Sequence, residues 1–281
     1  MEDNEKNALE YLAISKTHQL RLSRFKYYEN LKANAAKQSS KSLIAFGRKI
    51  YSQNEEDGII LEIFNRIGTT NKIFVEFGVE NGLECNTRAL LFYGWRGLWI
   101  ESNIQMVQCV KEELPITINT GQLSVLQAFI NRDNINELLS SKIPEKEIDL
   151  LSIDIDGNDY HVLCDITCVK PRVIVIEYNA KFPPPIQYCK QYNENHIWNG
   201  SDDYGASIEF YDKALNEMGY KLVVCDLTGT NAFFVQEGLL EDKFHEPCNA
   251  EHHYQPARYF LNGITSGHPA SNGTIENRVQ V

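Results

Sequence analysis

A run of carboxylates follows what looks like a buried strand. Residues 149–163 read DLLSIDIDGNDYHVL, in which an apolar run gives way to three acids, Asp154, Asp156 and Asp159. Like charges repel one another, and burying a carboxylate costs free energy unless something compensates for it. We therefore expect a cation, a bound proton or hydrogen-bond donors to offset that cost at this point of the chain.

A second predicted strand ends with residues of the same kind. Glu177 and Asn179 close the stretch RVIVIEYN, and residues two apart at the end of a strand project from one face. Carboxylate and amide oxygens are ligands that hard cations prefer, and an ion there would bind a substrate hydroxyl and lower its pKa. Asp154, Glu177 and Asn179 are therefore a candidate site for Mg²⁺ or Mn²⁺.

The same acids could also act without an ion. Two neighbouring carboxylates push one pKa upward, so Asp154 or Asp156 is a candidate general base. His196 is another, because imidazole titrates near neutrality and because it lies in 181–205, a proline-rich and aromatic segment typical of a lid or binding loop. Alternatively, Asp154 hydrogen-bonds amines of a ligand, and residues 156–159 only form a turn and cap the next helix.

A different set of residues predicts a nucleoside site. The stretch EFGVENG places Glu76 on a strand and Gly78 and Gly82 in the turn after it, where glycines let the backbone approach a ligand. Glu101 ends the next strand, beside Ser102, and an acid there can hydrogen-bond both ribose hydroxyls. Because the GxGxxG pattern of dinucleotide sites is missing, a nicotinamide-dependent oxidoreductase is disfavoured. An adenosyl ligand without a pyrophosphate, S-adenosylmethionine, fits better.

The elements that must position these residues alternate along the chain. Short apolar strands separated by helical spacing indicate a doubly wound, mostly parallel sheet, closed by a hairpin over residues 220–236, with ligands beyond the carboxyl ends of the strands. The predicted parallel strands are 72–78, 97–102, 116–120, 147–155 and 172–179.

These features together resemble a known family. The order of the strands, EFGVENG, WIES, SIDIDGNDY followed by IEYN, and the closing GTNAFFV are similar to the class I methyltransferases, and within them to the FkbM type. The resemblance covers roughly residues 50–240 and implies a Rossmann-like fold and methyl transfer from S-adenosylmethionine, usually to a sugar or polyketide hydroxyl.

The resemblance also implies roles for particular residues. Glu76, Gly78 and Gly82 would surround the methionine end of the donor, and Glu101 would hold its ribose. Gln122 or Ser124, after the third predicted strand, would approach the adenine.

The composition of the chain limits the kinds of molecule that it is expected to bind. The chain has 281 residues and a formal net charge of −11, which opposes nonspecific binding to nucleic acid because phosphates need a basic surface. No apolar run approaches the roughly 18 residues of a membrane span, and the acidic start of the chain lacks a signal core. Seven cysteines without paired spacing indicate reduced thiols. We expect a cytoplasmic protein with a small-molecule substrate.

Three regions are expected along the chain. Residues 1–47 form a helical arm of one or two amphipathic helices, through which copies of the chain could associate as a homo-oligomer. Residues 48–240 form the methyltransferase domain, and residues 241–281 form an irregular C-terminal tail.

The function expected from the sequence is an S-adenosylmethionine-dependent O-methyltransferase that acts on a sugar hydroxyl, in particular on a nucleotide-linked sugar used for capsule or surface polysaccharide. Two alternatives stay open. One is a noncatalytic binding protein with the same fold, which the retained acids disfavour; the other is a methyltransferase for another small metabolite.

Overall fold

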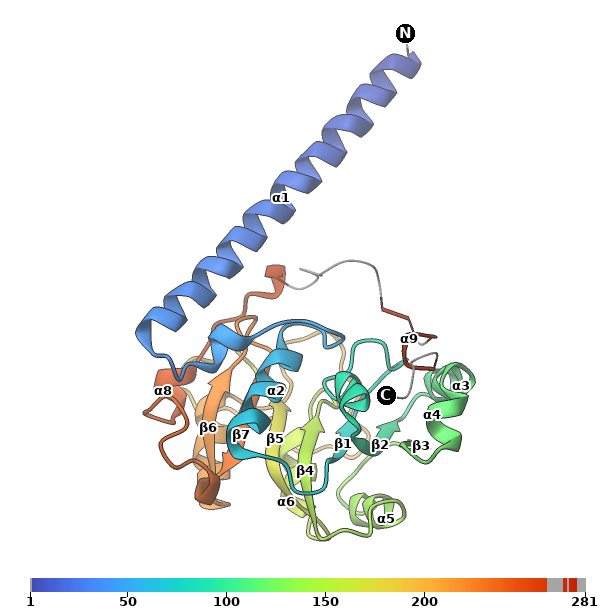
Figure 1. Cartoon of the computed structure of the whole chain (residues 1–281), viewed down its shortest axis with the longest axis vertical. Coiled ribbons are helices and arrows are strands. Elements are labelled where there is room, and N and C mark those ends of the chain that lie inside the picture. The colour runs from blue at the N-terminus through green and yellow to red at the C-terminus, as the bar shows by residue number, and fades with distance from the viewer. Residues whose placement is uncertain (1, 262–269, 272, 277–281) are drawn as a thin grey trace.

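A seven-stranded sheet forms the centre of the molecule. The computed structural model describes residues 2–261, 270–271 and 273–276 (Figure 1). The sheet has the order β3-β2-β1-β4-β5-β7-β6, in which only β7 runs antiparallel to its neighbours. The strands are β1 (Ile73–Phe77), β2 (Arg96–Glu101), β3 (Leu123–Gln127), β4 (Glu147–Ile153), β5 (Lys170–Glu177), β6 (Tyr220–Cys225) and β7 (Asn231–Gln236).

This topology confirms the predicted doubly wound, mostly parallel sheet. It differs from the dinucleotide-binding order 3-2-1-4-5-6 because the antiparallel β7 lies between β5 and β6. The predicted hairpin supplies that strand.

Helices cover both faces of the sheet, which explains why its strands are apolar on both sides. Side chains of α2, η2 and α3 pack on one face, and those of α5, α6 and α7 pack on the other (Figure 1). The helical elements are α1 (Glu2–Gln38), η1 (Leu43–Phe46), α2 (Glu56–Ile67), η2 (Arg88–Tyr93), α3 (Ile104–Glu113), α4 (Pro115–Asn119), α5 (Ile135–Ser140), α6 (Asp159–Asp165), α7 (Ile208–Glu217), η3 (Glu237–Leu239), α8 (Ala250–His253), η4 (Tyr259–Leu261) and α9 (Gly273–Glu276).

The third strand was predicted in the wrong place. Residues 116–120 lie in and just after the helix α4, and β3 begins only at Leu123. The β-branched residues of ITINT suggested a strand, but Pro115 stands at the first helical position, where its fixed φ favours a helix start. Between β1 and β2 only Arg88–Tyr93 is helical, and it is of the 3₁₀ type.

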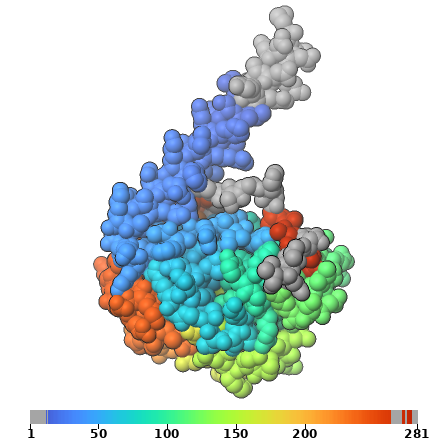
Figure 2. Space-filling model, viewed as in Figure 1, coloured from blue at the N-terminus to red at the C-terminus, as the bar shows by residue number. Residues whose placement is uncertain are grey.

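The N-terminal arm is one helix that projects away from the sheet (Figures 1 and 2). Its last turns contact the domain: Ala35 is buried, and the ring of Tyr27 lies 6.0 Å from that of Phe260. In the described part of α1 the apolar residues do not recur on one side of the helix, and Leu12 and Leu22 are 62% and 59% exposed. The predicted amphipathic character is therefore wrong, and association of copies through this helix stays a prediction.

The described parts of the C-terminal region pack on the domain. α8 lies against β6 and α7, and Ile275 of α9 is buried in the core. The carboxylate of Glu276 accepts hydrogen bonds from the backbone N–H groups of Ile116 and Thr117. Residues 262–269, 272 and 277–281 of the predicted tail lie outside the described residues. No helix in the described ranges is long and apolar enough to cross a membrane.

Candidate active site

The predicted crevice lies where β1, β4 and β5 end side by side. The register pairs Phe77 with Ile153, and Ile153 with Ile176, so Gly78, Asp154 and Glu177 follow at the same edge of the sheet. Gly78 has φ +73°, and a Cβ there would lie 1.7 Å from the backbone oxygen of Asp154. Gly78 is therefore required for β1 and β4 to approach each other at the crevice.

Three carboxylates converge at this edge. Asp154, Asp156 and Glu177 each offer an oxygen, and these oxygens all lie within 4.8 Å of one another. Asp154 and Glu177 are partly buried, and burial raises the pKa of each; repulsion from Asp159 adds to the rise at Asp154, and repulsion from Asp154 adds to the rise at Glu177. Burial also raises the pKa of Asp156. The predicted meeting of strand-end acids is thus present, with Asp156 as its third member; we call Asp154, Asp156 and Glu177 the acid trio.

Asn179 is not part of the acid trio. Its Nδ2 donates hydrogen bonds to the backbone oxygens of Asp202 (2.8 Å) and Tyr204 (3.1 Å), and its Oδ1 accepts one from the backbone N–H of Lys181. These bonds engage its amide at the two ends of the 181–205 loop, and the role of Asn179 as a metal ligand stays a prediction.

A tight turn gives Asp156 its position. Asp156 itself has φ +59°, a left-handed conformation that L-residues seldom adopt. The buried carboxylate of Asp159 accepts hydrogen bonds from the backbone N–H groups of Ile155 and Gly157, and so holds the turn from below. The turn expected as an alternative to an ion site is present, but Asp159 stabilises this turn rather than capping its own helix.

The 181–205 loop brings His196 to the acid trio. His196 Nε2 lies 3.0 Å from the backbone oxygen of Asp156, and a Cβ at Gly157 would lie 2.4 Å from the His196 ring. The imidazole also acts against the burial effect on the pKa of Asp156. His161, by contrast, lies 2.7 Å from the backbone oxygen of Lys190 and fixes the loop.

On the donor side, Glu76 is committed to the protein. One of its oxygens accepts the backbone N–H of Asn86, and the other accepts the N–H and the hydroxyl of Thr87. Burial raises the pKa of Glu76 to about 7. Glu76 therefore positions the turn after β1, and its contact with the methionine end of a donor stays a prediction.

Glu101 joins the turns that follow β1 and β2. Its Oε2 accepts the backbone N–H of Glu80 (2.8 Å), and its Oε1 accepts the N–H of Asn103 (2.8 Å) and the hydroxyl of Ser102 (3.2 Å). Oε2 accepts only one hydrogen bond and so keeps capacity for a further one. A Cβ at Gly82 would lie 2.7 Å from the Trp99 ring, so this turn also depends on its glycine.

We predict that Glu101→Ala weakens S-adenosylmethionine binding about tenfold or more, because it removes a charged acceptor from the ribose and releases the turn at Glu80. Isothermal titration calorimetry measures this. Glu147→Ala, an exposed acid at the start of β4, is the matched control and should bind as the wild type does. Equal donor affinity in both variants would contradict the assignment of Glu101.

The observed position of β3 does not bring Gln122 and Ser124 to the predicted adenine site. Gln122 precedes β3 and donates to the backbone oxygens of Leu91 and Trp95, and Ser124 pairs with Leu98 near the start of the strand. Both therefore lie toward the amino edge of the sheet, away from the crevice. The carboxyl end of β3 is Gln127, whose Nε2 donates to the backbone oxygen of Ser102.

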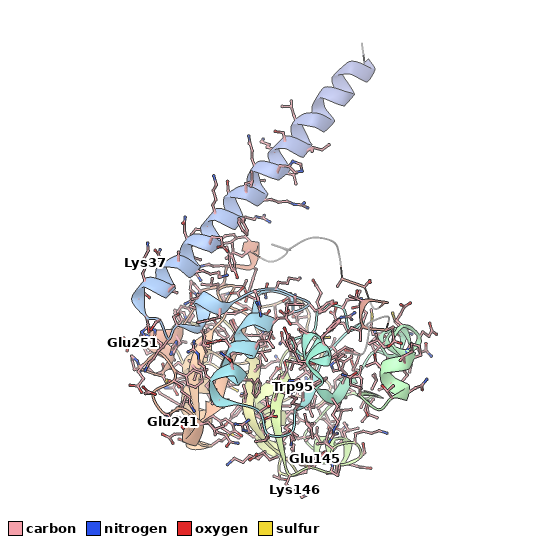
Figure 3. All side chains as sticks on the ribbon, in the orientation of Figure 1. Lys37, Trp95, Glu145, Lys146, Glu241 and Glu251 are labelled. Carbon is pink, nitrogen blue, oxygen red and sulfur yellow. The ribbon has the colours of Figure 1, made fainter. Side chains whose placement is uncertain are left out.

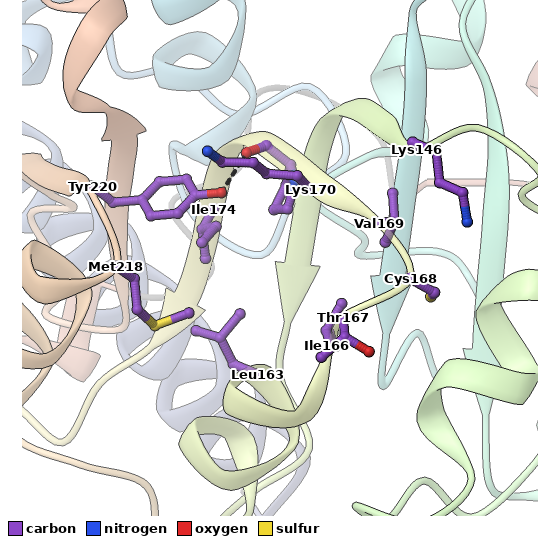
Figure 4. Close-up of a pocket in the computed structure, with 11 residues that line it drawn as sticks. Lys146, Leu163, Ile166, Thr167, Cys168, Val169, Lys170, Ile174, Met218 and Tyr220 are labelled. Carbon is purple, nitrogen blue, oxygen red and sulfur yellow. Dashed lines mark hydrogen bonds between the residues drawn. The ribbon is translucent and has the colours of Figure 1, made fainter.

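A cavity of about 350 Å³ lies at this same amino edge, opposite the edge that carries the acid trio. Its lining includes Lys146 and Lys170, which precede β4 and begin β5, and the Tyr220 hydroxyl donates to the backbone oxygen of Pro171 (Figure 4). Lys146 lies at the end of the body opposite α1 (Figure 3).

Sequence reasoning missed one group of residues beside the acid trio. Asn54 and Glu56, at the start of α2, and Asn231, at the start of β7, form a buried hydrogen-bonded set next to Glu177. Nothing in the spacing of the polar stretch SQNEED before α2 indicates that it reaches β7.

Comparisons with known proteins agree with this geometry. The family profile described as methyltransferase FkbM domain matches residues 86–222. The comparison with curated proteins found no significant match.

Solved structures resemble this chain only with low TM-scores and low sequence identities. A protein of Staphylococcus aureus provisionally described as a caffeoyl-CoA O-methyltransferase has a TM-score of 0.47 at 13% identity, covering 79% of this chain and 99% of that one. An O-methyltransferase from Bacillus cereus in complex with SAH has a TM-score of 0.41 at 14% identity, with coverages of 75% and 89%. The family profile therefore carries the assignment: residues 86–222 of the chain match the methyltransferase FkbM domain, and the mostly parallel sheet is consistent with that match.

Proposed function

We propose that the protein transfers the methyl group of S-adenosylmethionine to a hydroxyl oxygen of a sugar, and that this sugar is carried on a nucleotide for the synthesis of capsule or surface polysaccharide. The observation that supports the proposal best is the acid trio, which lies beside the Gly78 turn at the strand ends and has His196 within reach. The sulfonium carbon and the acceptor oxygen must meet in line, so the crevice acts mainly by positioning the two.

The acceptor proton needs a base. Burial raises the pKa of Asp154 and Asp156, which makes either carboxylate a stronger base than an exposed one. His196 lies against the same turn and is the third candidate. Any of the three can take the hydroxyl proton while the methyl group is transferred.

The acid trio also fits a divalent cation. Its oxygens lie within 4.8 Å of one another, and Glu177 Oε2 is buried without a hydrogen-bond partner among the described residues. Mg²⁺ or Mn²⁺ takes carboxylate ligands of this kind. Bound there, the ion would lower the pKa of the acceptor hydroxyl.

The test is incubation of the purified protein with S-adenosylmethionine and a panel of nucleotide-linked and free sugars, followed by mass spectrometry. A gain of one methyl group, mapped to a hydroxyl, is the expected result. Donor binding without transfer to any member of the panel would favour the noncatalytic alternative, and a methyl group mapped to nitrogen would contradict O-methylation.

A further inference from the structure

Buried acceptor atoms without donors lie next to the acid trio. Asn54 and Asn231 are 6% and 4% exposed, and the Oδ1 of each is buried without a hydrogen-bond partner in the described structure. Glu177 Oε2 shares this condition. A buried acceptor left without a donor costs free energy, so such atoms in a folded protein call for an explanation.

The register places Asn231 beside the acid trio. Asn231 is paired with Glu177 across the antiparallel β5–β7 pair, and directly opposed residues in such a pair project from the same face. Their side chains are therefore neighbours on the face that α2 covers. Asn231 meets α2 there, because its Nδ2 donates to Glu56 Oε1 at 3.0 Å.

Glu56 fixes the orientation of both amides. Asn54 Nδ2 donates to the same Glu56 Oε1 at 3.1 Å, and the backbone N–H of Asn54 donates to Oε2 at 2.8 Å. Turning either amide over would place its oxygen against a carboxylate oxygen, and two acceptors repel. The nitrogens of Asn54 and Asn231 are therefore committed to Glu56, and their oxygens are left to accept; we call Asn54, Glu56 and Asn231 the amide shelf.

The surrounding charges favour a neutral group that donates hydrogen bonds. In the part of the chain that the structure describes, no lysine or arginine forms an ion pair with the acid trio. The loop lysines Lys181 and Lys190 pair instead with Asp202 and Asp203. A phosphate at the amide shelf would meet the Glu56 carboxylate and the amide oxygens of Asn54 and Asn231, which all accept, whereas hydroxyl groups would donate to these oxygens.

We propose that the amide shelf binds the sugar end of the methyl acceptor, with the Oδ1 atoms of Asn54 and Asn231 accepting hydrogen bonds from two of its hydroxyl groups. The inference rests on the proposed function and narrows it. The portion of the acceptor in the crevice is an unphosphorylated, polyhydroxylated ring, and any phosphate that it carries lies outside the acid trio and the shelf.

The experiment combines protein and substrate changes. Wild type, Asn54→Ala and Asn231→Ala are assayed at fixed Mg²⁺ with a sugar of the panel that the wild type methylates. They are also assayed with the monodeoxy analogues of that sugar, each of which lacks one hydroxyl. Each alanine variant should raise the KM for the parent sugar about three- to tenfold, and the dissociation constant for S-adenosylmethionine should change less than twofold. Asn71→Ala, which alters an exposed amide at the amino edge of the sheet, is the matched control.

The deoxy analogues decide whether the shelf makes the contact. With the wild type, one deoxy analogue should show a rise in KM about equal to the rise that the alanine variant shows with the parent sugar. With that variant, the same analogue should show no further rise in KM, because both changes remove the same hydrogen bond. If the rise in KM from the alanine substitution multiplies the rise from the missing hydroxyl for every analogue, the shelf does not contact the sugar and the proposal is overturned. The wild-type analogue series alone still tests this where an alanine variant does not fold.

Failure of the proposed function has a different signature. If the wild type methylates no sugar at all, the proposed function fails before the shelf is tested through KM. Calorimetry of the donor-bound protein with the free sugars then tests the shelf itself, and equal affinity for parent and deoxy sugars would overturn the inference.

Discussion

Asp154→Asn should slow methyl transfer about a hundred- to ten-thousandfold and leave the affinity for S-adenosylmethionine within about twofold of wild type. Asp154 follows the last residue of β4 and belongs to the acid trio, where we propose that it acts as base or as cation ligand; general bases contribute about 10²–10⁴ in rate. Single-turnover kinetics and calorimetry measure the two quantities. Transfer at the wild-type rate would remove Asp154 from the chemistry.

The same substitution should stabilise the fold at neutral pH. Burial raises the pKa of Asp154, with repulsion from Asp159 and Asp156 adding to it, so the folded state favours the protonated acid. The stabilisation from that proton is complete below the unfolded pKa of about 3.9 and is lost as pH rises through the raised folded pKa. The neutral amide of Asn does not suffer this loss.

Thermal unfolding in the presence of a chelator, which keeps cations from the site, checks the sign. Asp154→Asn should melt about 2 °C or more above wild type at pH 8, and the difference should shrink as pH falls toward 4. Asp133→Asn, which changes an exposed acid, is the control and should melt at the wild-type temperature both at pH 8 and near pH 4. A melting difference that grows as pH falls would contradict the raised pKa.

The architecture was readable from the sequence because its strands carry a strong local signal. β1, β4 and β5 are buried on both faces and so read as continuous apolar runs, and their observed ends lie within two residues of the predicted ones. β3 failed because it is an edge strand with partly exposed residues, while the more β-branched segment before it is held in a helix that starts at Pro115.

The candidate site was readable only in part, for a different reason. Strand ends meet at one edge of a parallel sheet, so the convergence of Asp154 and Glu177 follows from their positions along the chain. Which oxygens are already engaged does not follow. Glu76 and Asn179 look as available as Glu177, and only tertiary contacts show that their polar atoms bind the protein's own backbone.

Removing divalent cations should abolish methyl transfer, and donor binding should be largely retained. The acid trio brings three carboxylates together without an ion pair to any described lysine or arginine, so a cation there would relieve their repulsion and orient the acceptor hydroxyl, whereas the sulfonium needs no metal. Activity measured after exhaustive chelation, and again after addition of Mg²⁺ or Mn²⁺, tests this. Both ions should restore transfer.

A ligand substitution separates a site in the acid trio from a general effect of chelation. Glu177→Gln removes one negative charge and weakens one ligand, so the Mg²⁺ concentration that gives half-maximal activity should rise about tenfold, which corresponds to about 1.4 kcal/mol. The control, Glu147→Gln, changes an exposed acid at the opposite edge of the sheet and should leave that concentration unchanged. Full activity in protein shown to be metal-free would eliminate the ion and leave Asp154, Asp156 or His196 to take the acceptor proton.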